Sequence, residues 1–273
     1  MSEPSKFVET CGYRTHYIEM GSGKPLILVH GGGAGADARG NWESLAMPLF
    51  AQSRRVIAMD MVGFGDSLPE HHETFDYSPE SRVEQLAAFI EALNIGPVDI
   101  IGNSMGGRTS VALASDRPEL VDRLVLMGSA GLDHGMGGAL QALVHYDFTL
   151  VGMERIVAAL THDGFTPEPA MVQYRLDLSC RDANREAFKQ TMMQIKERGG
   201  LWLEEARIAK VKHRVLVVNG KNDKVVPVSQ AIRYLELLEN STGVLLPHCG
   251  HWAMIEHPGV FAAIATSFLD GQL

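Results

Sequence analysis

Six short apolar segments recur along this 273-residue chain, and a glycine-rich or polar cluster follows each of them. The segments are residues 25–29, 55–59, 98–101, 123–127, 214–218 and 243–246. Uninterrupted apolar runs of this length are typical of strands covered on both faces, as in a parallel sheet flanked by helices. Helical patterns lie between them, and Ser78-Pro79 and Pro258 are good helix starts. We therefore expect an α/β fold with a mostly parallel central sheet, preceded by an antiparallel hairpin over residues 7–20.

One long stretch, between the fourth and fifth segments, contains no strand-like run. From about residue 134 to residue 206, its apolar residues follow helical spacings. Two ordinary crossover helices are the simpler interpretation, but the stretch is too long for them, because ordinary connections are short. We expect a helical insertion, so that residues 1–133 and 207–273 form one α/β core and residues 134–206 form a helical lid.

Charge and cysteine content narrow the classes of function. The net charge of −9 at pH 7 argues against a nucleic-acid partner, which requires a basic surface. Cys11, Cys180 and Cys249 have no metal-binding or disulfide spacing. We see no signal-peptide pattern and no apolar run of about 18 residues, so we expect no membrane partner and a cytoplasmic location.

The cluster at residues 102–107 reads GNSMGG and contains the pattern Gly-x-Ser-x-Gly. An apolar segment precedes it and a helix-compatible segment, residues 108–114, follows it. In this context the pattern forms a sharp strand-to-helix turn that lifts the serine hydroxyl into a cleft. The glycines leave room for a turn in which other side chains would clash. Ser104 is therefore a candidate nucleophile.

A serine nucleophile needs a base and an acid that orients the base. Asp223 follows the fifth segment and His251 follows the sixth, which gives the chain order Ser, Asp, His of the α/β hydrolases. Ligands of open α/β sheets bind at the carboxyl ends of the strands, so we expect these three side chains to converge there. His248 is the alternative base, and a turn residue is the alternative role for Asp223.

The glycine loop after the first segment offers backbone N–H groups. We expect Met105 and Gly32 to form an oxyanion hole with their N–H groups. Residues 31–36 also fit a G-x-G-x-x-A dinucleotide fingerprint, with Asp60 at the end of the next segment. That fingerprint needs a helix that begins within the glycines, and residues 37–42 are not an amphipathic helix start. We therefore expect no dinucleotide, no metal and no other cofactor.

Three of these motifs together resemble the meta-cleavage product hydrolases, which are carbon–carbon bond hydrolases of the α/β-hydrolase fold from bacterial aromatic degradation. They are the glycine loop at residues 30–35, the GNSMGG elbow and the segment Gly250-His251-Trp252. The acid loop at residues 223–227 is similar as well, and the resemblance spans nearly the whole chain. It implies cleavage of the C5–C6 bond of an anionic 2-hydroxy-6-oxohexa-2,4-dienoate, by ketonisation and then attack of the triad serine, in a homo-oligomer.

The resemblance also implies substrate contacts. Asn41 and Asn103 match polar residues near the substrate, and Trp252 matches the aromatic residue after the catalytic histidine. Gly31 and Gly33 flank the glycine expected in the oxyanion hole.

An arginine is expected against the substrate carboxylate, because a planar guanidinium binds a carboxylate through two parallel hydrogen bonds. Arg175 falls in the lid where the family places this arginine. Arg108 and Arg181 are the alternatives, and Arg108 departs from the small residue that the family more often has there.

A carboxylesterase or thioesterase using the same triad is the alternative function, since the triad alone does not exclude it. A receptor without catalytic activity is a third class. An aspartate-nucleophile dehalogenase is excluded, because position 104 is serine. The C6 substituent depends on the walls that residues 134–206 build around the site.

Overall fold

Eight strands form one sheet in the computed structural model, which describes residues 2–132 and 140–273. Their order across the sheet is β1-β2-β4-β3-β5-β6-β7-β8. The bounds are β1 Lys6–Thr10, β2 Tyr13–Met20, β3 Lys24–Val29, β4 Arg54–Met59, β5 Val98–Asn103, β6 Val121–Met127, β7 Arg214–Gly220 and β8 Ser241–Leu246. β2 pairs antiparallel with β1 and β4, and the other neighbouring pairs are parallel. The predicted hairpin and the six predicted parallel strands are confirmed.

The apolar segments form the centre of the sheet because both of their faces are covered. Ile27 and Leu28 of β3, Ile57 of β4, and Ile100 and Ile101 of β5 are all 0% exposed. Burying one such side chain contributes about 1.5–3 kcal/mol relative to leaving it in water. A strand with only one buried face would alternate apolar and polar residues, and these strands do not.

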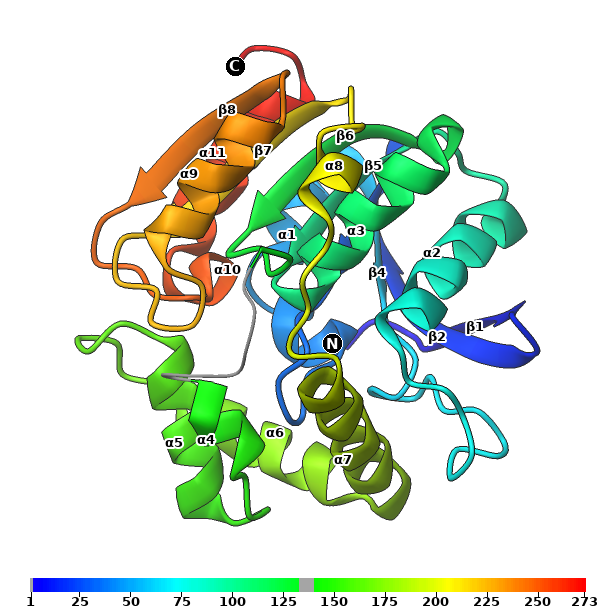
Figure 1. Cartoon of the computed structure of the whole chain (residues 1–273), viewed down its shortest axis with the longest axis vertical. Coiled ribbons are helices and arrows are strands. Elements are labelled where there is room, and N and C mark those ends of the chain that lie inside the picture. Colours follow the sequence, from blue (N-terminus) through cyan, green and yellow to red (C-terminus); the bar gives the residue numbers. More distant parts are fainter. Residues whose placement is uncertain (1, 133–139) are drawn as a thin grey trace.

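Helices cover both faces of the sheet (Figure 1). α2, α3, α8 and α9 lie over one face, and α1 and α11 pack together on the other. The bounds are α1 Met47–Phe50, α2 Pro79–Leu93, α3 Met105–Asp116, α8 Glu205–Ile208, α9 Val228–Leu237, α10 Ala253–Glu256 and α11 Pro258–Leu269, with short helical turns η1 Arg39–Glu43 and η2 Pro118–Leu120. The predicted start of α2 is confirmed, since the Ser78 side chain accepts a hydrogen bond from the Ser81 N–H at 3.2 Å.

Between β6 and β7 the chain forms a group of helices that lies to one side of the sheet (Figure 1). They are α4 Gln141–Val144, α5 Leu150–Leu160, α6 Pro169–Cys180 and α7 Asp182–Glu197. α5 packs against α6, α6 packs against α7, and α6 also contacts η1 of the core. The lid is predicted to begin at about residue 134, and residues 134–139 lie outside the described residues.

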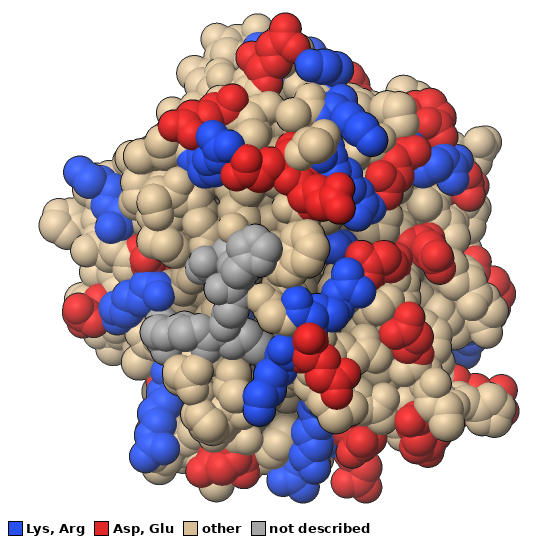
Figure 2. Space-filling view, in the orientation of Figure 1, with Lys and Arg blue, Asp and Glu red and all other residues tan. Residues whose placement is uncertain are grey.

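Acidic and basic side chains are interspersed on the face of the molecule drawn in Figure 2. Two ion pairs link α8 to its neighbours on this side, Arg207 with Asp116 of α3 and Glu205 with Arg233 of α9. Among the described residues, no helix has the length and apolar character needed to cross a membrane.

Candidate active site

Ser104 occupies a strained turn between β5 and α3. Its backbone has φ 54° and ψ −116°, a conformation that costs a non-glycine residue about 1–3 kcal/mol. The turn is held to the end of β6, because the Ser104 N–H donates to the Met127 carbonyl at 3.1 Å and the Ala130 N–H donates to the Ser104 carbonyl at 3.1 Å. The structure thus has the strand–turn–helix context that the sequence predicts for residues 102–107.

The flanking glycines of the pattern are required by close backbone contacts. A Cβ at Gly106 would lie 2.4 Å from the Val29 carbonyl oxygen, and one at Gly102 would lie 2.7 Å from the Gly106 carbonyl oxygen. α3 can therefore approach β3 and β5 closely enough to hold the turn only because both positions lack a side chain.

His251 and Asp223 form a buried pair at the ends of the two last strands. His251 Nδ1 lies 2.7 Å from Asp223 Oδ2, and both side chains are almost fully buried. The second carboxylate oxygen, Asp223 Oδ1, accepts hydrogen bonds from the N–H groups of Val225 and Val226, each at 2.8 Å. Both carboxylate oxygens of Asp223 are thus hydrogen-bonded. Because Asp223 occupies Nδ1 of His251, Nε2 remains available to a nucleophile.

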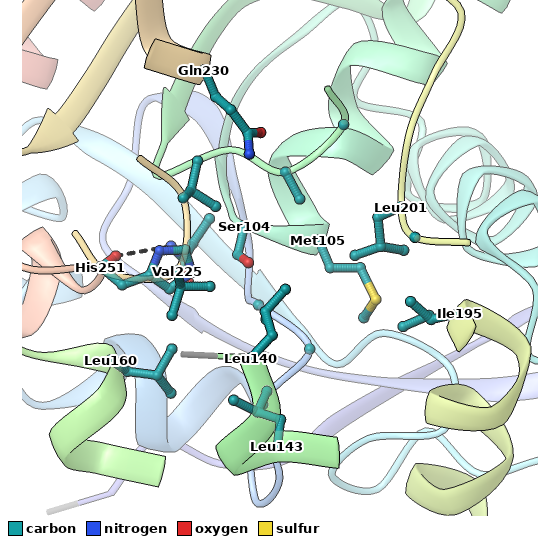
Figure 3. Close-up of a pocket in the computed structure, with 18 of the residues that line it drawn as sticks. Ser104, Met105, Leu140, Leu143, Leu160, Ile195, Leu201, Val225, Gln230 and His251 are labelled. Carbon is teal, nitrogen blue, oxygen red and sulfur yellow. Dashed lines mark hydrogen bonds between the residues drawn. The ribbon is translucent and has the colours of Figure 1, made fainter. Parts of the chain in front are cut away.

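Ser104 and His251 line the same pocket (Figure 3). Asp223 stands behind His251 and is not part of the lining. His248, the alternative base, is exposed, and its carbonyl accepts a hydrogen bond from His257. The structure therefore places Ser104 and His251 in one pocket, with Asp223 bonded to His251, and these are the three groups that nucleophilic catalysis by serine uses.

The two N–H groups predicted for an oxyanion hole border the same pocket. Met105 is the first residue of α3, where a backbone N–H has no acceptor within the helix. Gly31, Gly32 and Gly33 lie opposite, and a Cβ on Gly32 would come within 3.0 Å of Met105 Sδ. The glycine loop and the elbow thus approach each other at the candidate nucleophile, which is where developing negative charge needs hydrogen-bond donors.

His30 anchors this glycine loop, a role that the sequence analysis did not assign. The Met61 N–H donates to His30 Nε2 at 3.0 Å, and His30 Nδ1 lies 2.7 Å from the Gly31 carbonyl oxygen. Since Nε2 accepts, the ring is neutral with its proton on Nδ1. Burial lowers the pKa of His30 to about 4, which keeps the ring neutral at physiological pH.

Asn103 lines the pocket, but its amide donors are used inside the protein. Nδ2 donates to the Met127 carbonyl at 3.0 Å and to the His251 carbonyl at 3.4 Å. Asn103 therefore joins β5, β6 and the His251 loop. Its Oδ1 is buried without a partner among the described residues.

Arg175, Asn41 and Trp252 come together beside the pocket. The Arg175 guanidinium lies 4.3 Å from the centre of the Trp252 ring and donates to Asn41 Oδ1 at 3.1 Å and to the Gly40 carbonyl at 3.2 Å. Trp252 lines the pocket, whereas Arg175 and Asn41 stand behind that lining. Arg175 is 0% exposed, and its Nε and Nη1 have no hydrogen-bond partner in the described part of the chain.

The electrostatics around Arg175 are unusual, because within the described residues it forms no ion pair. The nearby Asp37 is engaged elsewhere, since it accepts hydrogen bonds from Tyr174 Oη at 2.5 Å and from the Gly40 N–H at 2.6 Å. Burial raises the pKa of Asp37 to about 7 and lowers the pKa of Arg175 to about 10.

The two alternative arginines point elsewhere. Arg108 is buried against α2, where it donates to the Pro79 carbonyl at 3.2 Å and to Glu80 Oε1 at 3.0 Å. Arg181 is exposed and pairs with Asp66. Neither side chain is part of the pocket lining.

Glu256 is a site residue that the sequence analysis missed. Its buried carboxylate accepts hydrogen bonds from the N–H groups of Gly250 at 2.9 Å and Trp252 at 3.3 Å, on either side of His251. It also binds the N–H and the Nδ1 of His162 at 2.8 Å each. In the sequence, Glu256 could be noticed only as an acidic residue next to the apolar run at residues 253–255. Its hydrogen-bond partners can be identified only from the fold.

Within the described residues, no group of three or more His, Cys, Asp and Glu side chains is placed to hold a metal ion.

Comparisons with known proteins agree on the fold and on the family. Residues 24–258 match the model of the alpha/beta hydrolase fold family. The chain is 48% identical to a 2-hydroxy-6-oxo-6-(2'-aminophenyl)hexa-2,4-dienoic acid hydrolase of Metapseudomonas resinovorans, over 97% of this chain and 90% of that protein. Two solved structures are also similar. A serine hydrolase involved in carbazole degradation is 46% identical with a TM-score of 0.90, covering 98% of this chain and 99% of that one.

The other is a meta-cleavage product hydrolase from Pseudomonas fluorescens IP01, 31% identical with a TM-score of 0.90, and the match covers 98% of each chain. The strand order, the elbow and the convergence of Ser104, His251 and Asp223 are what such a relationship requires of this chain. The chain belongs to the α/β-hydrolase family and, within it, to the meta-cleavage product hydrolases.

Proposed function

We propose that this protein hydrolyses the C5–C6 bond of a 2-hydroxy-6-oxohexa-2,4-dienoate, with Ser104, His251 and Asp223 as the catalytic triad. The observation that carries the proposal is the buried Arg175, which has two unpartnered nitrogen atoms and adjoins the aromatic wall of the pocket. A buried cation without a counter-ion is costly, and a substrate carboxylate would supply one. The similarity to a hydrolase named for a dienoic acid of this type supports the same substrate class.

The reaction begins with a proton transfer. The C2 hydroxyl of the dienol loses its proton and C5 gains one, so that C2 becomes a ketone and C5 becomes a tetrahedral carbon. His251 is the acid and base for this step, because it is the titratable side chain beside Ser104 in the pocket.

Serine attack follows. His251 takes the proton of Ser104, the serine oxygen bonds to C6, and the Gly32 and Met105 N–H groups stabilise the resulting oxyanion. The C5–C6 bond then breaks, and its electron pair is delocalised into the dienolate, which leaves as 2-hydroxypenta-2,4-dienoate after protonation. Water, activated by His251, hydrolyses the acyl-enzyme and releases the carboxylic acid.

The described part of the 134–206 insertion fits a lid over this site. α5 contributes Leu160 and α7 contributes Ile195 to the pocket, and Figure 3 shows Leu160 on the side of His251 and Ile195 beside Met105 and Leu201. Apolar walls of this kind exclude water from the reacting bond. Residues 134–206 as a lid, a homo-oligomeric state and a cytoplasmic location are parts of the same proposal.

The decisive experiment separates carbon–carbon hydrolysis from ester hydrolysis. Purified protein is mixed with a 6-phenyl dienoate, and the loss of dienolate absorbance is compared with release of p-nitrophenol from p-nitrophenyl acetate. We expect efficient cleavage of the dienoate, and loss of that cleavage in Ser104→Ala and His251→Ala. Efficient ester hydrolysis with no cleavage of the dienoate would make the protein an esterase and refute the proposal.

Arg175 has its own test. Arg175→Ala should raise KM for the dienoate by about 100-fold, since a charge-assisted pair of hydrogen bonds contributes about 3 kcal/mol. The same variant should leave ester hydrolysis nearly unchanged, because p-nitrophenyl acetate carries no carboxylate. An unchanged KM for the dienoate would contradict the assignment of Arg175.

A further inference from the structure

Tyr174 and Asp37 form a hydrogen bond between the 134–206 insertion and the core, next to Arg175. Tyr174 Oη, on α6, donates to Oδ2 of the buried Asp37 at 2.5 Å. Neither side chain is part of the pocket lining, so neither contacts a substrate bound there. Any role of this pair in the reaction therefore acts through another residue.

The Asp37 carboxylate also fixes the peptide that Arg175 binds. Asp37 Oδ1 accepts a hydrogen bond from the Gly40 N–H at 2.6 Å, and the Gly40 carbonyl accepts one from Arg175 Nη2 at 3.2 Å. Arg175 Nη2 also donates to Asn41 Oδ1 at 3.1 Å. Both acceptors that the guanidinium has among the described residues thus belong to residues 40–41, a segment that Asp37 holds at Gly40.

The backbone of α6 contacts the core at the same place. A Cβ on Gly40 would lie 2.9 Å from Cε1 of the Tyr174 ring, and one on Gly35 would lie 2.1 Å from the Arg175 carbonyl oxygen. The helix that carries Arg175 therefore rests directly on residues 35–40. Asp37 joins the two segments, because one of its oxygens binds Tyr174 and the other binds Gly40.

We propose that Tyr174 and Asp37 are positioning residues, which join α6 to residues 40–41 and so hold the Arg175 guanidinium in the orientation that binds the substrate carboxylate. A guanidinium is planar, and it binds a carboxylate well only when its plane is correctly oriented. The two hydrogen bonds of Nη2 set that plane, and Nε and Nη1 have no partner among the described residues. This inference rests on the proposed function and names the residues that set the affinity of its carboxylate site.

The test is a double-mutant cycle of Tyr174→Phe and Arg175→Ala, with KM and kcat measured for the 6-phenyl dienoate. Tyr174→Phe removes one hydroxyl and keeps both the ring against Gly40 and the charge of Asp37. It should raise KM about 10-fold with little change in kcat, because a hydrogen bond to a charged group is lost and the carboxylate lies away from the reacting bond. In the Arg175→Ala background, the same substitution should leave KM unchanged, since no guanidinium remains to be positioned.

Three further comparisons separate positioning from a purely structural role. Asp37→Asn keeps an acceptor for the Gly40 N–H and gains a donor for Tyr174 Oη, so it should raise KM less than Asp37→Ala does. Hydrolysis of p-nitrophenyl acetate, which carries no carboxylate, should stay at the wild-type rate in Tyr174→Phe. Tyr146→Phe is the matched control, because the Tyr146 hydroxyl is hydrogen-bonded to Ser179 Oγ at 2.8 Å within the insertion, and it should leave KM unchanged.

Each result has one meaning. If Tyr174→Phe has the KM of wild type, or raises KM equally with and without the Arg175 side chain, the inference is wrong although the proposed function stands. Equal losses of ester and dienoate hydrolysis in Tyr174→Phe would also overturn it, because the pair would then support the whole site. If wild type does not cleave the dienoate, the proposed function itself fails.

Discussion

Replacing Glu256 by glutamine tests whether hydrogen bonds to the Glu256 carboxylate hold the His251 loop in place. The carboxylate accepts hydrogen bonds from Gly250 and Trp252, which flank His251, and from the N–H and ring of His162. Glutamine exchanges one oxygen for an NH₂ group, which donates and cannot accept. Whichever oxygen is lost, at least one backbone N–H group then faces a donor.

The expected size of the effect follows from these contacts. A hydrogen bond to a charged group contributes about 1.5–3 kcal/mol, so the loss of one or two of them should lower the free energy of unfolding by about 3 kcal/mol. The His251 N–H also donates to the Leu160 carbonyl at 2.9 Å, two residues before His162. A shift of His162 is therefore transmitted to His251, and a misplacement of about 1 Å can reduce kcat 100-fold.

The assays are urea unfolding and dienoate turnover as a function of pH. Glu256→Gln should lower kcat much more than it changes KM, and should shift the pH dependence of kcat, because the surroundings of His251 change. Glu236→Gln is the matched control, since Glu236 forms an exposed ion pair with Arg233 on α9 and should alter neither measurement. A wild-type kcat and pH profile in Glu256→Gln would refute the positioning role of Glu256. A wild-type free energy of unfolding would refute the expectation that the variant loses one or two hydrogen bonds.

Three other predictions follow from the same geometry. Gly106→Ala should cost about 3 kcal/mol or more in unfolding free energy, because its Cβ would lie 2.4 Å from a backbone oxygen that cannot move. Gly259→Ala has open space around the Cβ and should be neutral or stabilising. Equal stabilities of the two variants by urea unfolding would contradict this. Arg108→Met should lower the unfolding free energy by about 2 kcal/mol, yet leave kcat/KM unchanged, because Arg108 binds α2 outside the pocket. The pKa of His30 is about 4 in the folded protein and about 6.5 in the unfolded protein. Between these two pH values, His30 is protonated in the unfolded state but not in the folded state. The free energy of unfolding therefore falls as the pH falls from about 6.5 to about 4. The stability difference between wild type and His30→Asn should therefore shrink by about 2 kcal/mol from pH 7 to pH 4.5, and a constant difference would show that His30 does not titrate this way.

The strands and the elbow could be predicted from the sequence because their causes are local. Continuous apolar runs report burial on both faces, and the glycines of the elbow report backbone contacts that no side chain tolerates. That Ser104, Asp223 and His251 lie near one another could be predicted for a related reason. Each follows a parallel strand, and parallel strands end at the same edge of the sheet.

The supporting residues could not be predicted, because their partners are distant in sequence and come together only in the fold. Glu256 follows His251 by five residues, but its other partner, His162, lies at the end of α5 in the insertion. His30 was visible next to the glycine loop, but its anchor, the Met61 N–H, comes from the segment after β4. Neither pairing has a local sequence pattern.

Three buried arginines differ in how many of their guanidinium nitrogen atoms have hydrogen-bond partners among the described residues. Arg82, Arg108 and Arg175 are all at most 1% exposed, although arginine is mostly an exposed residue. Arg82 binds the Tyr77 and Ser78 carbonyls and Thr191, and Arg108 binds Pro79 and Glu80, so each leaves only Nε without a partner. Arg175 leaves both Nε and Nη1, beside a ring that lines the pocket. The second unpartnered nitrogen, next to a residue of the pocket lining, is what distinguishes Arg175 and supports the proposal that it binds the substrate carboxylate.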